Sequence, residues 1–157
     1  MSGSYASGEV PRTHVHVDAA KLWGGGAATA CVAALVAFAG ILVFQGVLNV
    51  SLVRPALLLD LSGSLTADYV VTAFLLALVA TGLAHGLAFT TPRPRTFFTW
   101  IVGVATVCAA ALPFALDTDL ASQVATACIN VTLGICIASL IGAVMSRTVF
   151  FTTEASR

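Results

Sequence analysis

The chain alternates between long uncharged stretches and short polar segments. Residues 22–53, 69–92, 96–116 and 120–146 of the 157 residues contain no charged side chain. A helix needs roughly 18–20 apolar residues to cross ~30 Å of hydrocarbon, and each stretch is long enough. The pattern therefore predicts four transmembrane helices, near residues 24–48, 69–90, 97–116 and 120–146.

The connections predict how these helices are arranged. Residues 91–95, which contain Pro92 and Pro94, and residues 117–119 form short links. Short links make consecutive helices run antiparallel. We therefore expect an all-α, integral membrane, four-helix antiparallel bundle over residues 23–147. A flexible N-terminal tail (1–22) and a C-terminal tail (148–157) flank it. The longer connection, 49–68, is expected to lie on the bilayer surface or to cap the bundle.

Composition agrees with a chain whose main partner is the lipid bilayer. Hydrophobic residues make up 59% of the sequence and charged residues 9%, against ~45–50% and ~25% in average soluble domains. The same excess of apolar residues excludes a disordered chain. Seven basic and seven acidic residues leave no net charge, and nothing indicates the basic surface that nucleic acid requires.

The distribution of basic residues predicts the orientation. Arg54 lies on one side of the predicted bundle. The other basic residues lie on the opposite side: Arg12, Lys21, Arg93, Arg95, Arg147 and Arg157. By the positive-inside rule, both termini are cytoplasmic in a multi-pass protein of the cell inner membrane. Aromatic residues mark the same interfaces, with Trp23, Phe97, Phe98 and Trp100 at the inner one and Tyr69 at the outer one.

Small residues recur along two of the predicted helices. Lipid provides no hydrophobic force between helices, so close van der Waals contact must hold them together. The candidates for such packing, within one chain or between protomers, are Asn130, Gly134, Ala138, Gly142, Gly82 and Gly86. Asn130 is expected to hydrogen-bond across helices, to Thr106. A polar stripe of Gln123, Thr126 and Asn130 leaves a substrate path as the alternative interpretation.

Few residues offer chemistry. His85 is the one acid, base or imidazole inside a predicted span, which makes it a functional candidate; the alternative is a neutral histidine bonded to a carbonyl or to water. His14, His16 and Asp18 would share one face of an extended strand and hold a metal ion, or belong to the flexible tail. The four cysteines, Cys31, Cys108, Cys128 and Cys136, are interpreted as structural fillers. No span contains an acid, which argues against an ion-driven carrier. No catalytic, cofactor-binding or metal-binding residue is predicted.

Three segments carry a resemblance to a known family. They are Thr66-Ala-Asp-Tyr-Val-Val-Thr-Ala73, Pro92-Arg-Pro-Arg-Thr-Phe-Phe-Thr-Trp100 and Ala125-Thr-Ala-Cys-Ile-Asn-Val-Thr-Leu-Gly-Ile135. The chain resembles an uncharacterised family of small actinobacterial four-helix integral membrane proteins, a domain of unknown function. The resemblance implies the fold and an actinobacterial inner membrane, and no activity.

Three functional hypotheses follow. The first is a non-catalytic accessory or scaffold protein that acts through transmembrane helix association, as a homo-oligomer or in a larger membrane complex. The second is a small oligomeric carrier or channel that uses the polar stripe. The third is a membrane enzyme or haem protein that uses His85. The first is favoured, because catalytic motifs are absent from the sequence.

Overall fold

The computed structural model of the chain describes residues 14–53 and 63–152. A short strand, β1 (His14–Val17), precedes helix α1 (Ala19–Ile41), which continues as a π-helical segment, η1 (Leu42–Val47). Helices α2 (Leu65–Thr90) and α3 (Pro94–Ala111) follow, and α3 ends in a 3-10 turn, η2 (Leu112–Ala115). Helix α4 (Leu120–Thr148) leads into strand β2 (Val149–Thr152).

Four helices in the described part of the chain are long and apolar enough to cross a membrane. Their candidate spans are Ala19–Val47, Leu65–Thr90, Pro94–Ala115 and Leu120–Arg147. The protein is therefore a membrane protein, and the predicted all-α four-helix fold class is confirmed. Three helices begin earlier than predicted, α1 at Ala19, α2 at Leu65 and α3 at Pro94. The side chain of Asp18 sets the start of α1, because its Oδ1 accepts a hydrogen bond from the backbone N–H of Lys21 (3.2 Å), as N-cap residues do.

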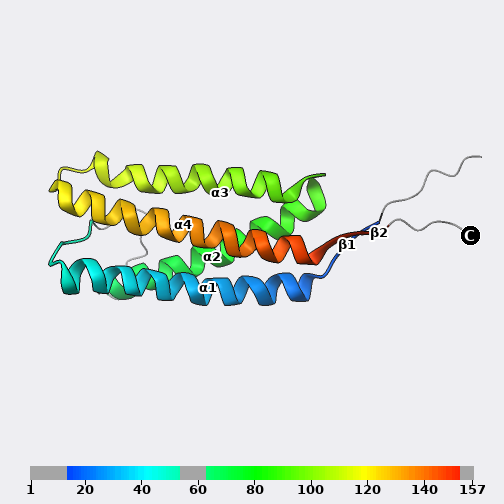
Figure 1. Ribbon diagram of the computed structural model, residues 1–157, viewed down its shortest axis with the longest axis horizontal. Coiled ribbons are helices and arrows are strands. Elements are labelled where there is room, and N and C mark those ends of the chain that lie inside the picture. Colours follow the sequence, from blue (N-terminus) through cyan, green and yellow to red (C-terminus); the bar gives the residue numbers. More distant parts are fainter. Residues whose placement is uncertain (1–13, 54–62, 153–157) are drawn as a thin grey trace, which may run out of the picture.

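The bundle is asymmetric. Helix α4 packs against both α1 and α3, and α1 packs extensively on α2, whereas α2 and α3 touch less. Figure 1 shows α4 between α1 and α3, with α2 behind. Helix α3 buries only two of its side chains, Phe98 and Val102. It is therefore held mainly by α4.

The contact between α1 and α2 is made by small side chains. Gly26 lies so close to α2 that a Cβ placed on it would sit 2.8 Å from the Cβ of Thr81. Further along, alanines of both helices are buried against each other: Ala30, Ala33 and Ala37 of α1, and Ala73, Ala77, Ala80, Ala84 and Ala88 of α2. Small residues let two backbones approach closely in lipid. The sequence analysis did not identify the matching small residues of α1.

The two strands join the ends of the chain's helical domain. β1 pairs antiparallel with β2, with His14 opposite Thr152 and Val17 opposite Val149. The pair extends beyond the helices where α1 begins and α4 ends (Figure 1). The turn between α2 and α3 lies at this end too, which we call the strand end. The sequence analysis treated residues 1–22 and 148–157 as tails and did not anticipate this pairing.

The other end of the bundle is closed in part by the segment that follows α1. Asn49 has a positive φ of 53°, a conformation that Asn tolerates better than most residues. The chain turns back there, and the N–H of Val50 bonds to the carbonyl of Phe44 (2.8 Å). Leu52 and Val53 are buried, so this part of the predicted 49–68 connection caps the bundle. Residues 54–62 lie outside the described residues.

The cysteines do not fill the core. Cys31, Cys108 and Cys128 are exposed on the helix surfaces and Cys136 is half-buried, all as free thiols. The interpretation of these residues as buried fillers is therefore wrong for the three exposed ones. Core and lipid are both apolar, so the sequence pattern does not separate the two environments.

Substitution of Gly26 in the first turns of α1 tests the close contact between α1 and α2. We expect Gly26→Ala to lower the free energy of unfolding by about 1–3 kcal/mol, because the added methyl group pushes α1 away from Thr81. Gly24→Ala is the matched control, since no atom lies within 4 Å of its added Cβ and alanine favours the helix by up to ~1 kcal/mol. Unfolding in neutral detergent, followed by circular dichroism, measures both. Equal stability of the two variants would contradict the contact.

Candidate functional site

Asn130 is at the centre of a hydrogen-bonded cluster that joins three helices. It lies on α4, and its Oδ1 accepts a hydrogen bond from the hydroxyl of Tyr69 on α2. Its Nδ2 donates to the backbone carbonyl of Ala109 on α3 (2.8 Å). We call Tyr69, Asn130 and Ala109 the polar clamp. Asn130 is half-buried, and an amide within a membrane-spanning helix is costly unless it is bonded in this way.

The carbonyl of Ala109 is available because of a proline. In an α-helix it would accept the N–H of residue 113, but Pro113 has no N–H. The preceding carbonyl, that of Cys108, still receives the N–H of Leu112. In lipid, a carbonyl freed by proline needs a partner from the protein. The side chain of Asn130 is that partner.

One sequence-based expectation about this cluster is wrong. Thr106 was expected to bond Asn130, but its hydroxyl donates to the carbonyl of Val102 in its own helix (2.7 Å). The side chain of Tyr69, which the sequence analysis used as a marker of the outer membrane interface, is buried in the bundle. The signal that pointed to the true partner was Pro113, which frees a carbonyl four residues earlier.

The other members of the predicted polar stripe also bond to backbone groups of the bundle. The hydroxyl of Thr126 accepts the N–H of Val53 (3.0 Å) and donates to the carbonyl of Ser122 (2.8 Å). The Nε2 of Gln123 donates to the carbonyls of Leu116 (2.9 Å) and Thr118 (3.1 Å), in the turn before α4. Each polar side chain of the stripe therefore holds a neighbouring segment in place.

The predicted packing residues fall into two groups. Gly134 lies against α3, where an added Cβ would sit 2.7 Å from the Cβ of Thr106, and Ala138 packs partly buried against the core. Gly142 has one near atom, the Nε of Arg95, 3.9 Å from its position for a Cβ. No atom lies within 4 Å of a Cβ built on Gly82 or Gly86. These two residues make no close contact within the described chain.

A groove of about 240 Å³ separates α2 from α3, with α4 as its floor. The clamp residues Asn130 and Ala109 line it, together with apolar and small residues: Leu76, Val79, Ala80, Leu83, Ile101, Val102, Ala105, Thr106, Leu133, Gly134 and Ile137. The groove follows from the asymmetry of the bundle, because α3 rests on α4 and leaves α2 partly uncovered. Its walls suit an apolar side chain or an acyl chain.

His85 lies among aromatic rings of α1 and α2. Its ring centroid is 6.3 Å from that of Trp23 and 5.0 Å from that of Phe89, the latter nearly perpendicular. Its Nδ1 is buried and has no hydrogen-bond partner among the described residues. The sequence analysis expected a neutral histidine bonded to a carbonyl or to water, and among the described residues no carbonyl is found bonded to Nδ1.

An acid does lie inside one of the helices. Asp68 is in the first turn of α2 and is fully buried, whereas the sequence analysis placed it in the outer loop and concluded that no span holds an acid. That conclusion is wrong, because α2 begins four residues earlier than predicted. A carboxylate in the first turn of a helix is favoured by the positive end of the helix dipole.

No group of three metal-ligating residues is found among the described side chains, those of residues 18–53 and 63–147. Asp18, the third member of the proposed His14, His16 and Asp18 site, caps α1 and pairs with the ammonium group of Lys21 (2.8 Å). The side chains of the two histidines lie outside the described part of the structure.

The comparison with known protein families identifies the chain. The model of a family of unknown function (DUF6069) matches residues 17–148. The chain belongs to this family. The match covers all four helices of the DUF6069 chain and confirms the resemblance seen in its sequence, while no curated protein and no solved structure matches it.

The clamp of this DUF6069 chain makes a testable prediction about Pro113. Asn130→Leu is expected to lower the free energy of unfolding by about 1–2 kcal/mol, because it leaves a carbonyl and a hydroxyl without partners. In a Pro113→Ala background, the backbone N–H at position 113 can donate a hydrogen bond to the carbonyl of Ala109. Asn130→Leu should then lower the free energy of unfolding by less. A double-mutant cycle of unfolding in detergent measures the difference.

Ser139→Ala is the control for this cycle, because the Ser139 hydroxyl bonds only to carbonyls of its own helix, those of Ile135 and Cys136. It should change stability by less than about 0.5 kcal/mol. An equal cost of Asn130→Leu with and without Pro113 would show that the proline does not create the need for the amide.

Proposed function

We propose that the protein is a non-catalytic, multi-pass membrane protein that acts through transmembrane helix association, as an accessory or scaffold component. The observation that carries the proposal is the open face of α2. Gly82 and Gly86 have the four-residue spacing of a helix association motif, and nothing lies within 4 Å of a Cβ built on either. Val79, one turn away, is 68% exposed.

The groove beside this face supports the same proposal. Val79 lines the groove between α2 and α3, so the open glycine face and the groove form one lateral surface. Ala105, a small and exposed residue of the groove, would let a further helix approach. A second copy of this chain or a helix of a larger membrane complex fits such a surface.

The carrier hypothesis gains no support from the polar stripe on which it was based. Gln123, Thr126 and Asn130 are bonded to backbone groups of the same bundle. A transport path needs polar groups that are free to exchange partners with a solute. The stripe is better explained as structural, which favours the accessory role.

The same proposal includes the orientation. Lys21, Arg93, Arg95 and Arg147 belong to elements that meet at the strand end of the bundle. By the positive-inside rule this end is cytoplasmic, with both termini on that side. A reporter fused to the C-terminus, active only in the cytoplasm, checks the assignment.

Substitution of the open glycines tests the association. We expect the protein extracted in mild detergent to form an assembly larger than the 16.0 kDa monomer. Gly82→Leu with Gly86→Leu should weaken it by about 5- to 150-fold, as added side chains at a close helix contact cost about 1–3 kcal/mol. Mass measurement after purification from native membranes gives the result.

The matched control is Gly103→Leu on α3, where a Cβ also meets nothing within 4 Å and which does not line the groove. It should leave the assembly intact. Gly134→Leu is unsuitable, since the new side chain collides with Thr106 inside the bundle. A monomeric wild-type protein, or equal losses for Gly103→Leu and the α2 variants, would contradict the proposal.

A further inference from the structure

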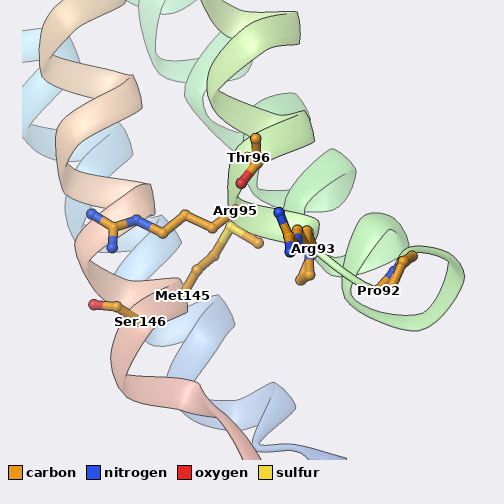
Figure 2. A pocket seen from close by; sticks show the side chains of 7 residues that line it. Pro92, Arg93, Arg95, Thr96, Met145 and Ser146 are labelled. Atoms are coloured by element: carbon orange, nitrogen blue, oxygen red, sulfur yellow. The ribbon is translucent and has the colours of Figure 1, made fainter.

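A pocket lined by basic, hydroxyl and apolar residues opens at the strand end of the bundle, apart from the groove and the clamp. It has a volume of about 290 Å³ and lies between the α2–α3 turn and the last turns of α4. Its lining combines two arginines and two hydroxyl residues with apolar ones: Arg93, Arg95, Thr96, Ser146, Pro92, Pro94 and Met145. Figure 2 shows Arg95 extending across α4 past Met145, with Arg93 on the turn.

The two arginines of this pocket have no ion-pair partner among the described residues. At this end Lys21 pairs with Asp18, which is the one described acid there. The remaining described acids, Asp68, Asp117 and Asp119, belong to elements at the other end. Within 18–53 and 63–147, no acid therefore pairs with either of the two positive charges at the pocket.

The lack of a side chain at position 142 leaves room for one of these charges. The Nε of Arg95 lies 3.9 Å from the place a Cβ on Gly142 would occupy, so the guanidinium crosses α4 at a glycine. A Cβ at position 142 would be in van der Waals contact with this side chain. Gly142, predicted as a packing residue between helices, therefore lies beside the Arg95 side chain.

Exposed aromatic residues indicate the depth of the pocket in the membrane. Phe97 and Trp100, in the first turns of α3, are 49% and 71% exposed. Tryptophan on the surface of a membrane protein is enriched at the level of the lipid headgroups. Arg93 and Arg95 precede them in the chain, so we expect the pocket to lie at the level of the lipid phosphates.

We propose that this pocket binds a phosphate group, held by the guanidinium groups of Arg93 and Arg95 and reached by the hydroxyls of Thr96 and Ser146. Arginine matches phosphate with two parallel hydrogen bonds, which a single ammonium group does not. An anionic phospholipid headgroup presents such a group at this depth, and a soluble phosphate offers the same chemistry. The proposal is independent of helix association.

Lipid binding to the full-length protein in neutral detergent tests the proposal. The probes are phosphatidylglycerol, phosphatidylcholine, and inorganic phosphate added with phosphatidylcholine; native mass spectrometry and the melting temperature report binding. Phosphatidylglycerol should bind about tenfold or more tightly than phosphatidylcholine. Replacing both arginines (Arg93→Gln, Arg95→Gln) should lower that affinity by about 25-fold, at about fivefold for each arginine near a lipid surface. Both side chains are exposed, so the variant should fold.

Arg147→Gln is the matched control, because it removes the same charge near the same end but does not line this pocket. It should lower the affinity by no more than about twofold. Stabilisation by inorganic phosphate, lost in the double variant, would support the pocket with a soluble ligand. The proposal would be overturned if Arg147→Gln lowered the affinity for phosphatidylglycerol as much as Arg93→Gln or Arg95→Gln alone. It would also be overturned if neither phosphatidylglycerol nor inorganic phosphate bound in preference to phosphatidylcholine.

Discussion

One vacant backbone carbonyl organises much of this bundle. Pro113 cannot donate to the carbonyl of Ala109, and lipid offers no substitute donor. The amide of Asn130 fills the vacancy, and its oxygen accepts the hydroxyl of Tyr69. Three helices are thereby joined at one point. The connection matters most for α3, which buries few side chains of its own and would otherwise be held by its contact with α4.

The remaining stability comes from shape. Because hydrocarbon gives helices no hydrophobic reason to associate, α1 and α2 are held by close backbone approach through glycine and alanine. Helix α3 lacks such a partner in α2, and a groove remains between them. The need for close backbone approach therefore explains both the tight contact between α1 and α2 and the groove between α2 and α3. An open lateral face beside Gly82 and Gly86 is the basis for proposing that this member of a family of unknown function works by associating with another helix.

The sequence predicted the four helices well, since the thickness of hydrocarbon fixes how long an apolar helix must be. It predicted the details of packing less well. Asn130 was recognised as an interhelical residue, but its partner depended on which carbonyl Pro113 leaves vacant. Asp68 was assigned to the 49–68 connection because α2 was predicted to begin after it, whereas the helix begins at Leu65. The exposed cysteines were wrongly predicted to fill the core, because lipid and protein core are equally apolar and the sequence pattern does not separate them. The pairing of His14–Val17 with Val149–Thr152 joins residues too distant in the chain for a local pattern to reveal.

The central claim is that the polar stripe of Gln123, Thr126 and Asn130 is bonded to backbone groups of the bundle and does not line a water-filled path. Thiol labelling tests it most directly, in lipid nanodiscs that expose both faces, with the four native cysteines replaced by alanine. Thr126→Cys should be unreactive toward a water-soluble thiol reagent, because position 126 is buried beneath Val53, whereas Thr118→Cys in the exposed turn should react readily. Comparable labelling at both positions would reveal a water-filled path along α4 and contradict the account.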